Sequence, residues 1–240
     1  MSVTPPATQV WAHRGARRQA PENTVAAFRR ARTLGADGVE LDARRSADDA
    51  VVVHHDPTGR GVGVLAASPL ATLRAALPAL ATLDEALDVS AGGLVNVELK
   101  NLPGEPDYDP EDRLAALVAA TLERRGHRDD VLVSSFNLGI LDRYRTLDPA
   151  TPTGLLTVWN FDVDAALTLV LERGHAALHP HARGFTSRKA TAVIGRAHER
   201  GVRVHVWTVN QPARVRRLAA AGVDAVVTDL PDVALRALGR

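Results

Sequence analysis

Short apolar runs rich in β-branched residues alternate with amphipathic stretches along almost the whole chain. This alternation is typical of a parallel sheet whose strands are joined by helices. The apolar runs predict nine strands, at residues 10–13, 38–43, 51–55, 94–99, 131–136, 154–158, 176–180, 202–209 and 225–229. The chain therefore belongs to the α/β class.

The stretches between the strands carry recognisable helix starts and ends. Residues 23–35 open on an Asn or Thr cap and close on a glycine, and Thr82 with Glu85 has the spacing of a capping box. Residues 109–126 place Pro110 and acidic residues in the expected first turn and arginines in the last, as the helix dipole favours. Further helices are expected at 137–146, 162–173, 187–200, 211–221 and 231–238.

The strand at 51–55 does not fit a parallel arrangement. Too few residues separate it from the strand at 38–43 for the crossover that two parallel strands need. We expect it to return as an antiparallel hairpin. If Arg45 faces Ala50, the period of two places His55 on the face that carries the two acids of the preceding strand.

Eight strands with interposed helices remain once the hairpin strand is set aside. This is the count of a (β/α)₈ TIM barrel with an extra hairpin strand after strand 2. We see no linker, low-complexity tract or repeat that would divide the chain, so we expect residues 1–240 to form a single domain.

Composition narrows the function classes. The 29 basic and 28 acidic side chains leave a formal net charge of +1, so no field draws in nucleic acid or acidic membranes. The absence of cysteine excludes disulfides, thiol catalysis and zinc–thiolate sites. The first ten residues lack the features of a signal peptide, and no window of about 18 apolar residues occurs. We expect a cytoplasmic protein without an integral membrane segment, and its oligomeric state stays open.

Polar residues follow the predicted strands at the points where they end. The carboxyl ends of the strands carry the catalytic groups of a (β/α)₈ barrel. In chain order these residues are His13 and Arg14; Glu40 and Asp42; His54, His55 and Asp56; Glu98 and Lys100; Ser134, Ser135 and Asn137; His179 and His181; Trp207 and Asn210; and Asp229. The first four groups bring acids, histidines and cations to one rim, where we expect an active site.

Glu40, Asp42 and Glu98 carry the argument for a metal. Three neighbouring carboxylates cannot all stay ionised without a cation, and an all-oxygen ligand set favours Mg²⁺ or Ca²⁺ over zinc, with Mn²⁺ as an alternative. Arg14 and Lys100 are then not needed as counter-charges, and their donors suit phosphate oxygens. With two histidines to share acid and base roles near neutral pH, this set suits phosphoryl transfer to water.

Several motifs resemble the glycerophosphodiester phosphodiesterase family, in the same order and over essentially the whole chain. They are "AHRGARRQAPENTVAAF", "GADGVELDARRSADDAVVVHHDPT", "VNVELK", "VLVSSFN", and "VWTVN" followed by "GVDAVVTDLP". The family fold is a (β/α)₈ barrel, in agreement with the strand count. The resemblance implies hydrolysis of a small-molecule glycerophosphodiester to glycerol 3-phosphate and an alcohol.

The resemblance also implies roles for individual residues. His13 and His55 become the general acid/base pair, and Glu40, Asp42 and Glu98 bind one divalent cation. Arg14 and Lys100 contact the phosphate, and Trp207 matches an aromatic residue near the glycerol or product. One segment departs from the family. The insertion near the barrel mouth is short, and "GRGVG" replaces the usual turn after H-D-P-T, which leaves the preferred head group open.

Other residues have a simpler structural interpretation. We expect His54 to be structural because adjacent strand residues face opposite ways, and Lys100 could simply balance Glu98. A His179 and His181 pair is more often scaffolding than a second metal site. We assign no role to His175, His198 and His205. Gly59, Gly61 and Gly63 do not directly follow a strand, as the glycines of a phosphate-binding loop would. Ser134 and Ser135 do not lie in the G-x-S-x-G motif of a nucleophile elbow.

Two other functions remain open at this stage. A phospholipase D-like enzyme would act on lysophospholipids or form a cyclic phosphate, and it would need an apolar rim, for which Val62, Val64 and Leu65 are candidates. A non-catalytic phosphoester-binding barrel would have kept the fold alone. The presence of both histidines and all three metal acids argues against that scaffold.

Overall fold

The computed structural model describes residues 7–126, 130–185 and 187–240. Its centre is a closed barrel of parallel strands, which confirms the predicted fold. The barrel strands are β1 (Gln9–His13), β2 (Gly38–Arg45), β7 (Leu94–Leu99), β8 (Val131–Ser135), β9 (Thr153–Thr157), β10 (Ala177–Pro180), β11 (Arg203–Val206) and β12 (Ala225–Thr228). Strand β1 closes the ring because it pairs with both β12 and β2.

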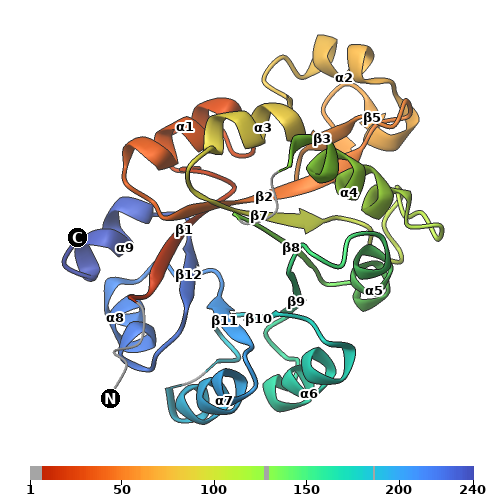
Figure 1. The fold of residues 1–240 in the computed structure, drawn as a ribbon. Coiled ribbons are helices and arrows are strands. Elements are labelled where there is room, and N and C mark those ends of the chain that lie inside the picture. Colours follow the sequence, from red (N-terminus) through yellow and green to blue (C-terminus); the bar gives the residue numbers. More distant parts are fainter. Residues whose placement is uncertain (1–6, 127–129, 186) are drawn as a thin grey trace.

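Helices surround the barrel in chain order (Figure 1). They are α1 (Val25–Thr33), α3 (Leu83–Ser90), α4 (Arg113–Arg125), α5 (Leu138–Leu147), α6 (Val163–Arg173), α7 (Ser187–Glu199), α8 (Pro212–Ala220) and α9 (Pro231–Ala237). Thr24 caps α1, and Thr82 and Glu85 form the predicted capping box of α3. Among the described residues, no helix is long and apolar enough to cross a membrane.

Helix α4 starts later than the sequence pattern predicts. Its first residue is Arg113, so Pro110 lies in the preceding turn. The side chain of Asn101 binds the Asp109 carbonyl and the Asp112 carboxylate there, and Asp112 has a left-handed φ of 52°. The acidic residues stabilise this turn, and the Asp109 carboxylate still reaches the helix start, where it accepts the Arg113 backbone N–H at 3.2 Å.

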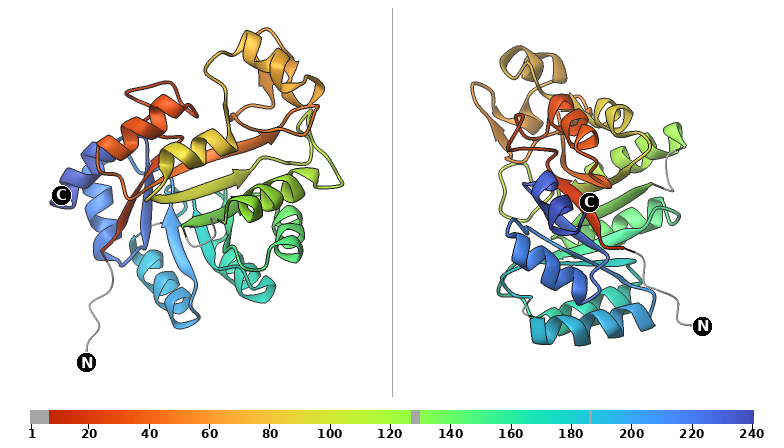
Figure 2. Two further views of the ribbon diagram at one scale, coloured as in Figure 1. Left: turned by 45° about the horizontal axis from the view of Figure 1, so that its top comes forward. Right: turned by 90° about the vertical axis from the view of Figure 1, so that its left-hand side faces the viewer.

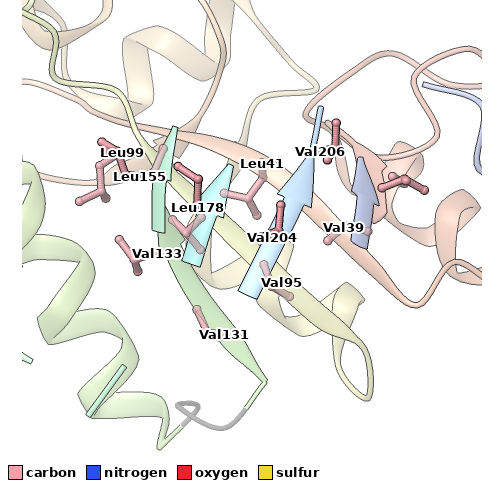
Figure 3. Packing of buried hydrophobic residues seen from close by; sticks show 14 of the residues in the cluster. Val39, Leu41, Val95, Leu99, Val131, Val133, Leu155, Leu178, Val204 and Val206 are labelled. Atoms are coloured by element: carbon pink, nitrogen blue, oxygen red, sulfur yellow. The ribbon is translucent and has the colours of Figure 1, made fainter. Parts of the chain in front are cut away.

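The main apolar core lies between the barrel and the helices. Alternate residues of β2 and β7, among them Val39, Leu41 and Val95, join helix residues in this cluster (Figure 3). The residues between them, such as Glu40, face the opposite side because strand side chains alternate. The interior of the barrel is thereby left to polar groups at its carboxyl end.

The hairpin forms outside the ring, as predicted, but in a different register. Strand β3 (Val51–Val53) pairs antiparallel with the end of β2, and β6 (Ala81–Thr82) pairs with β3. Arg45 faces Val51 and not Ala50, which corrects the expected register by one residue. The reason is a tighter turn: Ser46 and Ala50 bond to each other around three residues, of which Asp49 has a φ of 62°.

The segment after H-D-P-T forms a small folded insertion. It contains β4 (Thr58–Gly59), β5 (Gly63–Val64), a 3₁₀ helix (Leu65–Ala67) and α2 (Leu70–Ala76). These elements pack around an apolar cluster of their own, which includes Val52, Leu65, Leu73 and Leu80. The insertion projects beside β3 at the edge of the barrel (Figures 1 and 2).

Candidate active site

The three predicted metal acids meet on two neighbouring strands. Asp42 of β2 pairs in register with Glu98 of β7, and Glu40 lies one side-chain period earlier on β2. One ligand oxygen from each lies within 4.8 Å of the others, and all three residues are buried. The parallel pairing of two strands with acids at their carboxyl ends creates this cluster.

The electrostatics of the cluster reveal a shortage of positive charge. Burial and the neighbouring carboxylates raise the pKa of Glu40 well above its usual value. Burial likewise raises the pKa of Glu98 to about 7. Asp42 is buried as well, but Lys100 and Arg14 outweigh that effect and hold its pKa below the usual value.

The donor set fits a hard divalent cation. Glu40 Oε1 and Asp42 Oδ1 are buried and have no hydrogen-bond partner among the described residues. Unpaired buried carboxylate oxygens are costly, and a divalent cation bound by oxygen ligands would relieve that cost. The geometry thus agrees with the sequence argument for a cation among these three acids.

Arg14 reaches the cluster through an unusual backbone turn. Its φ is 57°, and its backbone N–H donates to Glu40 Oε2 at 2.9 Å. Its Nε lies 3.2 Å from Asp42 Oδ2, while its Nη1 donates to Glu22. Gly15 completes the turn at φ 78°, where a Cβ would come within 2.7 Å of Ala27. The H-R-G motif therefore sets the direction of the arginine.

Lys100 lies on the opposite side of the acids. Its Nζ donates to Glu98 Oε1 at 2.9 Å and lies 3.6 Å from Asp42 Oδ1. It is buried, yet these two carboxylates outweigh desolvation and raise its pKa. Lys100 balances Glu98, as the simpler interpretation holds, and it also lines the cavity described below.

The two predicted catalytic histidines also lie at this site. His13 Nδ1 lies 2.7 Å from Asp229 Oδ1, and its Nε2 lies 3.9 Å from Glu40 Oε2. His55 Nδ1 lies 2.7 Å from Asp56 Oδ1, and burial lowers the pKa of His55. Each imidazole thus has one nitrogen held by a carboxylate and the other left for chemistry.

A cavity of about 160 Å³ joins these groups at the carboxyl end of the barrel. Trp207 and Phe136 form one wall, with ring centroids 5.4 Å apart, and Trp207 Nε1 donates to the His179 carbonyl. The full lining is His13, Arg14, Glu40, His55, Asn96, Glu98, Lys100, Phe136, Leu156, His179, Trp207 and Val227. Asp42 lies just behind the lining, in contact with Arg14 and Lys100.

His55 reaches the cavity although the expected register is wrong. Strand β3 ends at Val53, and the His54 backbone N–H donates to the Asp42 carbonyl. The chain then leaves the ladder, so the strand period no longer decides where His55 points. His54 bonds the Asp56 carbonyl and lines a different pocket, in agreement with a structural role.

Sequence reasoning assigned no role to three partner residues, although it placed Asp56 and Asp229 at strand ends. Asp229 holds His13, Asp56 holds His55, and Asn23 donates to Asp42 Oδ2 at 2.8 Å. The available signals were an acid at the end of the last strand, an acid directly after a histidine, and the asparagine of P-E-N-T. Ring closure is needed only for the contact between His13 and Asp229, whereas Asp56 directly follows His55.

The other histidine pair does not form a metal site. His179 Nε2 bonds His205 Nδ1 at 3.0 Å inside the barrel, and His181 Nδ1 accepts the Arg183 backbone N–H. His179 and His181 therefore bond different partners, as the scaffold interpretation expects. His205, to which we assigned nothing, proves to support His179.

The fold is a (β/α)₈ barrel, and its carboxyl rim carries buried acids, two basic side chains and two histidines. This combination is typical of hydrolases that catalyse phosphoryl transfer to water. Residues 13–233 match the model of the Glycerophosphoryl diester phosphodiesterase family. The chain belongs to this family and is a phosphoric diester hydrolase.

Individual relatives agree with this assignment. A glycerophosphodiester phosphodiesterase of Caldanaerobacter subterraneus is 31% identical, with 94% of this chain and 95% of the relative covered. A solved phosphodiesterase of Oleispira antarctica, in complex with the product sn-glycerol-3-phosphate, is 28% identical with a TM-score of 0.84 and covers 98% of both chains. The glycerophosphodiester phosphodiesterase of Thermotoga maritima is 27% identical with a TM-score of 0.79, over 97% of this chain and 98% of that chain.

Proposed function

We propose that this cavity performs metal-dependent hydrolysis of glycerophosphodiesters to glycerol 3-phosphate and an alcohol, with His13 and His55 as acid and base. The observation that carries the proposal is the convergence of both imidazoles, Arg14, Lys100 and the buried acids on one cavity. Family membership and the product bound by the Oleispira relative support the same reaction.

Glu40, Asp42 and Glu98 are the residues that would hold the cation, as Mg²⁺ or Ca²⁺ with Mn²⁺ as an alternative. Such an ion supplies Lewis-acid stabilisation of the negative charge that develops on the phosphoryl oxygens. The three acids are preorganised for it because Asn23, the Arg14 backbone and Lys100 already fix the orientation of Asp42, Glu40 and Glu98 respectively.

Arg14 and Lys100 bind the phosphate in this account. Both side chains line the cavity, and both are held by carboxylates on one side. The N–H groups of Arg14 and Lys100 that are not bonded to carboxylates can donate hydrogen bonds to phosphate oxygens. Charged donors of this kind form the stronger class of hydrogen bond, and they stabilise charge where it develops.

His13 and His55 divide proton transfer. One imidazole takes the proton of the attacking oxygen, and the other gives a proton to the leaving alcohol oxygen. Asp229 and Asp56 bind the Nδ1 atoms, so the Nε2 atoms are the ones that exchange protons with the reacting groups. Trp207 forms the wall against which the glycerol or product rests.

The test is release of glycerol 3-phosphate from a panel of glycerophosphodiesters after chelation and after addition of Mg²⁺, Ca²⁺ or Mn²⁺. We expect release to stop on chelation and to return with a cation. Arg29, an exposed residue of α1, provides a control, because Arg29→Gln should leave release unchanged. No release with any cation or phosphodiester would favour the non-catalytic binding barrel.

One observation favours a second substrate class, phosphodiesters with an apolar chain such as lysophospholipids. Val158, Trp159 and Phe161 follow β9 at the active-site end of the barrel and are exposed. They form an apolar rim that Val62 and Leu65 do not, since Leu65 is buried and Val62 packs in the core of the insertion. Trp159→Ala should then weaken hydrolysis of a lysophospholipid but not of its deacylated counterpart.

The proposal also covers where in the cell the protein acts and how its chain is divided into domains. We propose that residues 1–240 act as one domain in the cytoplasm on a small-molecule substrate. Fractionation of cells with an antibody to the chain tests the location, and limited proteolysis tests the domain. Recovery of the chain in a membrane or extracellular fraction would contradict the first expectation.

A further inference from the structure

The floor of the active-site cavity contains polar atoms that the proposed chemistry does not use. Asn96 and His179 both line the cavity and are each 1% exposed. Asn96 Oδ1 and His179 Nδ1 have no hydrogen-bond partner among the described residues. Buried polar groups are nearly always paired, so two unpaired groups in one cavity point to a ligand that pairs them.

Both side chains are held in place by the barrel. Asn96 pairs in register with Glu40 on the neighbouring strand, which brings the amide beside the proposed metal site. The His179 ring is fixed through its Nε2 by His205 Nδ1 at 3.0 Å. Gly154 makes room for it, since a Cβ there would lie 2.6 Å from His179 Nε2. These contacts leave His179 Nδ1 as the free edge of the ring.

The chemistry of the floor suits a neutral polar ligand. Burial lowers the pKa of His179 to about 3, and burial and its neighbour lower that of His205 well below the usual value. Both rings are therefore uncharged at neutral pH and can hydrogen-bond without attracting an anion. Leu156 and Val227 line the same cavity and offer apolar contacts beside the polar ones.

We propose that Asn96 and His179 form a subsite for the hydroxyl groups of the glycerol moiety, at the bottom of the same cavity. This inference rests on the proposed function, because it places the phosphate above at Arg14 and Lys100. A hydroxyl both donates and accepts, so adjacent hydroxyls can pair an amide oxygen and an imidazole nitrogen. The glycerol carbons then contact Leu156 and Val227.

The subsite accounts for selection of glycerol over a plain alkyl group. A ligand without the hydroxyls leaves Asn96 Oδ1 and His179 Nδ1 buried and unpaired, and sites built to bind a hydroxyl strongly reject analogues that lack it. We expect sn-glycerol 3-phosphate to bind about tenfold tighter than propyl phosphate, or more, because a single lost buried hydrogen bond has about that effect.

The experiment is calorimetric titration of sn-glycerol 3-phosphate and of propyl phosphate into the metal-loaded protein. Asn96→Leu keeps the size of the side chain and removes its polar atoms. We expect it to weaken binding of sn-glycerol 3-phosphate about tenfold while propyl phosphate binding falls much less, so that the preference between the two ligands disappears. Asn96→Ala, which leaves space in place of the amide, should lose the preference in the same way if Asn96→Leu does not fold.

Ser134 provides the matched control. Its Oγ is also buried without a hydrogen-bond partner among the described residues, on the strand next to Asn96, but it does not line the cavity. Ser134→Ala should keep the wild-type preference. An unchanged preference in Asn96→Leu and Asn96→Ala, or equal binding of both ligands by the wild type, would overturn the subsite.

Failure of the subsite can be told from failure of the proposed function. A wild-type protein that releases glycerol 3-phosphate from its substrates but does not prefer that product over propyl phosphate retains the function and lacks the subsite. A protein that binds neither ligand and hydrolyses no glycerophosphodiester contradicts both.

Discussion

His13 and Asp229 come from the first and last strands of the barrel and form a hydrogen bond of 2.7 Å. Asp229 also accepts from Asn210 Nδ2 at 2.7 Å. Although burial acts to raise the pKa of Asp229, these two hydrogen bonds lower it to about 2. The carboxylate is thus ionised at any working pH, and it holds the Nδ1 edge of His13 so that the Nε2 edge faces the cavity.

Replacement of Asp229 by asparagine should reduce kcat. The variant Asp229→Asn removes the carboxylate that holds His13 Nδ1, and general acid/base catalysis contributes about 100-fold to 10,000-fold. We expect a loss of about 100-fold in steady-state kcat at neutral pH. Asp232→Asn, at an acid in the first turn of α9, is the control and should retain wild-type kcat. Equal activity of Asp229→Asn and wild type would show that the contact does not serve catalysis.

The same aspartate predicts a difference in acid stability. Its folded-state pKa is about 2 and its ordinary value is 3.8, so its stabilising contribution is present above pH 3.8 and is lost as pH falls toward 2. The stability advantage of wild type over Asp229→Asn should therefore shrink below pH 3.8. Urea denaturation at a series of pH values measures it. A constant difference across that window would contradict the pairing.

Substrates with different leaving groups should separate the roles of His13 and His55. A variant that lacks the general acid keeps more activity on a substrate whose leaving group needs no proton, such as p-nitrophenolate. We expect one of His13→Ala and His55→Ala to recover at least about tenfold, relative to wild type, on a p-nitrophenyl phosphodiester. An equal loss in both variants on both substrate types would contradict a division of labour.

Cation binding should release protons, with a defined pH dependence. The pKa of Glu98 is raised from 4.5 to about 7 in the metal-free fold, so a cation must displace the proton that Glu98 carries below that pH. We expect affinity to rise with pH through about 7, and Glu40, whose pKa is raised as well, adds to the protons released. Titration calorimetry in buffers of different ionisation enthalpy counts the protons. Cation binding at pH 6 without proton release would contradict this assignment.

The free energy of unfolding of the metal-free protein should fall as pH rises, whereas its affinity for the cation rises. A raised carboxyl pKa contributes stability that is present below pH 4.5 and is lost as pH rises through about 7. Saturating cation should abolish this loss. Glu98→Gln removes the titrating group and should flatten the same interval, as thermal denaturation at several pH values would show. A decline of equal size in Glu98→Gln would assign it to another group.

Arg44 should prove necessary for the placement of His55. This arginine is 1% exposed; its Nε and Nη2 donate to the His55 carbonyl at 2.9 and 2.7 Å, and its Nη1 binds Glu105 and Asp107. A lysine cannot make this set of planar contacts. We expect Arg44→Lys to lower kcat and to destabilise the fold by about 1 to 3 kcal/mol, because the lysine keeps the charge but leaves buried hydrogen bonds unmade.

The neighbouring arginine supplies the control for that measurement. Arg45 is partly exposed, and its Nε lies 3.8 Å from Asp109. Arg45→Lys should change the urea midpoint little, since exposed pairs contribute about 1 kcal/mol or less. Equal effects of the two substitutions on stability and kcat would refute a special role for Arg44.

Sequence reasoning predicted the barrel and the cluster of three acids because both follow from the pattern of strands. The alternation of strands and helices is visible in the order of residues, and Glu40 and Asp42 share a face by the period of two. Glu98 joins them because parallel strands in a barrel end on one rim. These inferences need only the strand boundaries and the direction of the chain.

The partner residues could not be predicted in the same way. Asp229 is 216 positions from His13 in the sequence, and only ring closure brings them together. The register of the hairpin depended on a three-residue turn whose geometry is set by Ser46 and Asp49, so a guess at loop length shifted it. His55 lies beyond the end of β3, where the strand period no longer applies. The fold of the insertion depends on a small cluster of apolar residues that has no clear period.

The most direct test of the account is the pH dependence of kcat/KM on a glycerophosphodiester at saturating cation. Two imidazoles that act as acid and base predict a bell-shaped profile in wild type, with the limb of the missing group absent from His13→Ala and from His55→Ala. A profile in wild type that is flat through the imidazole range would contradict two-histidine catalysis in this cavity.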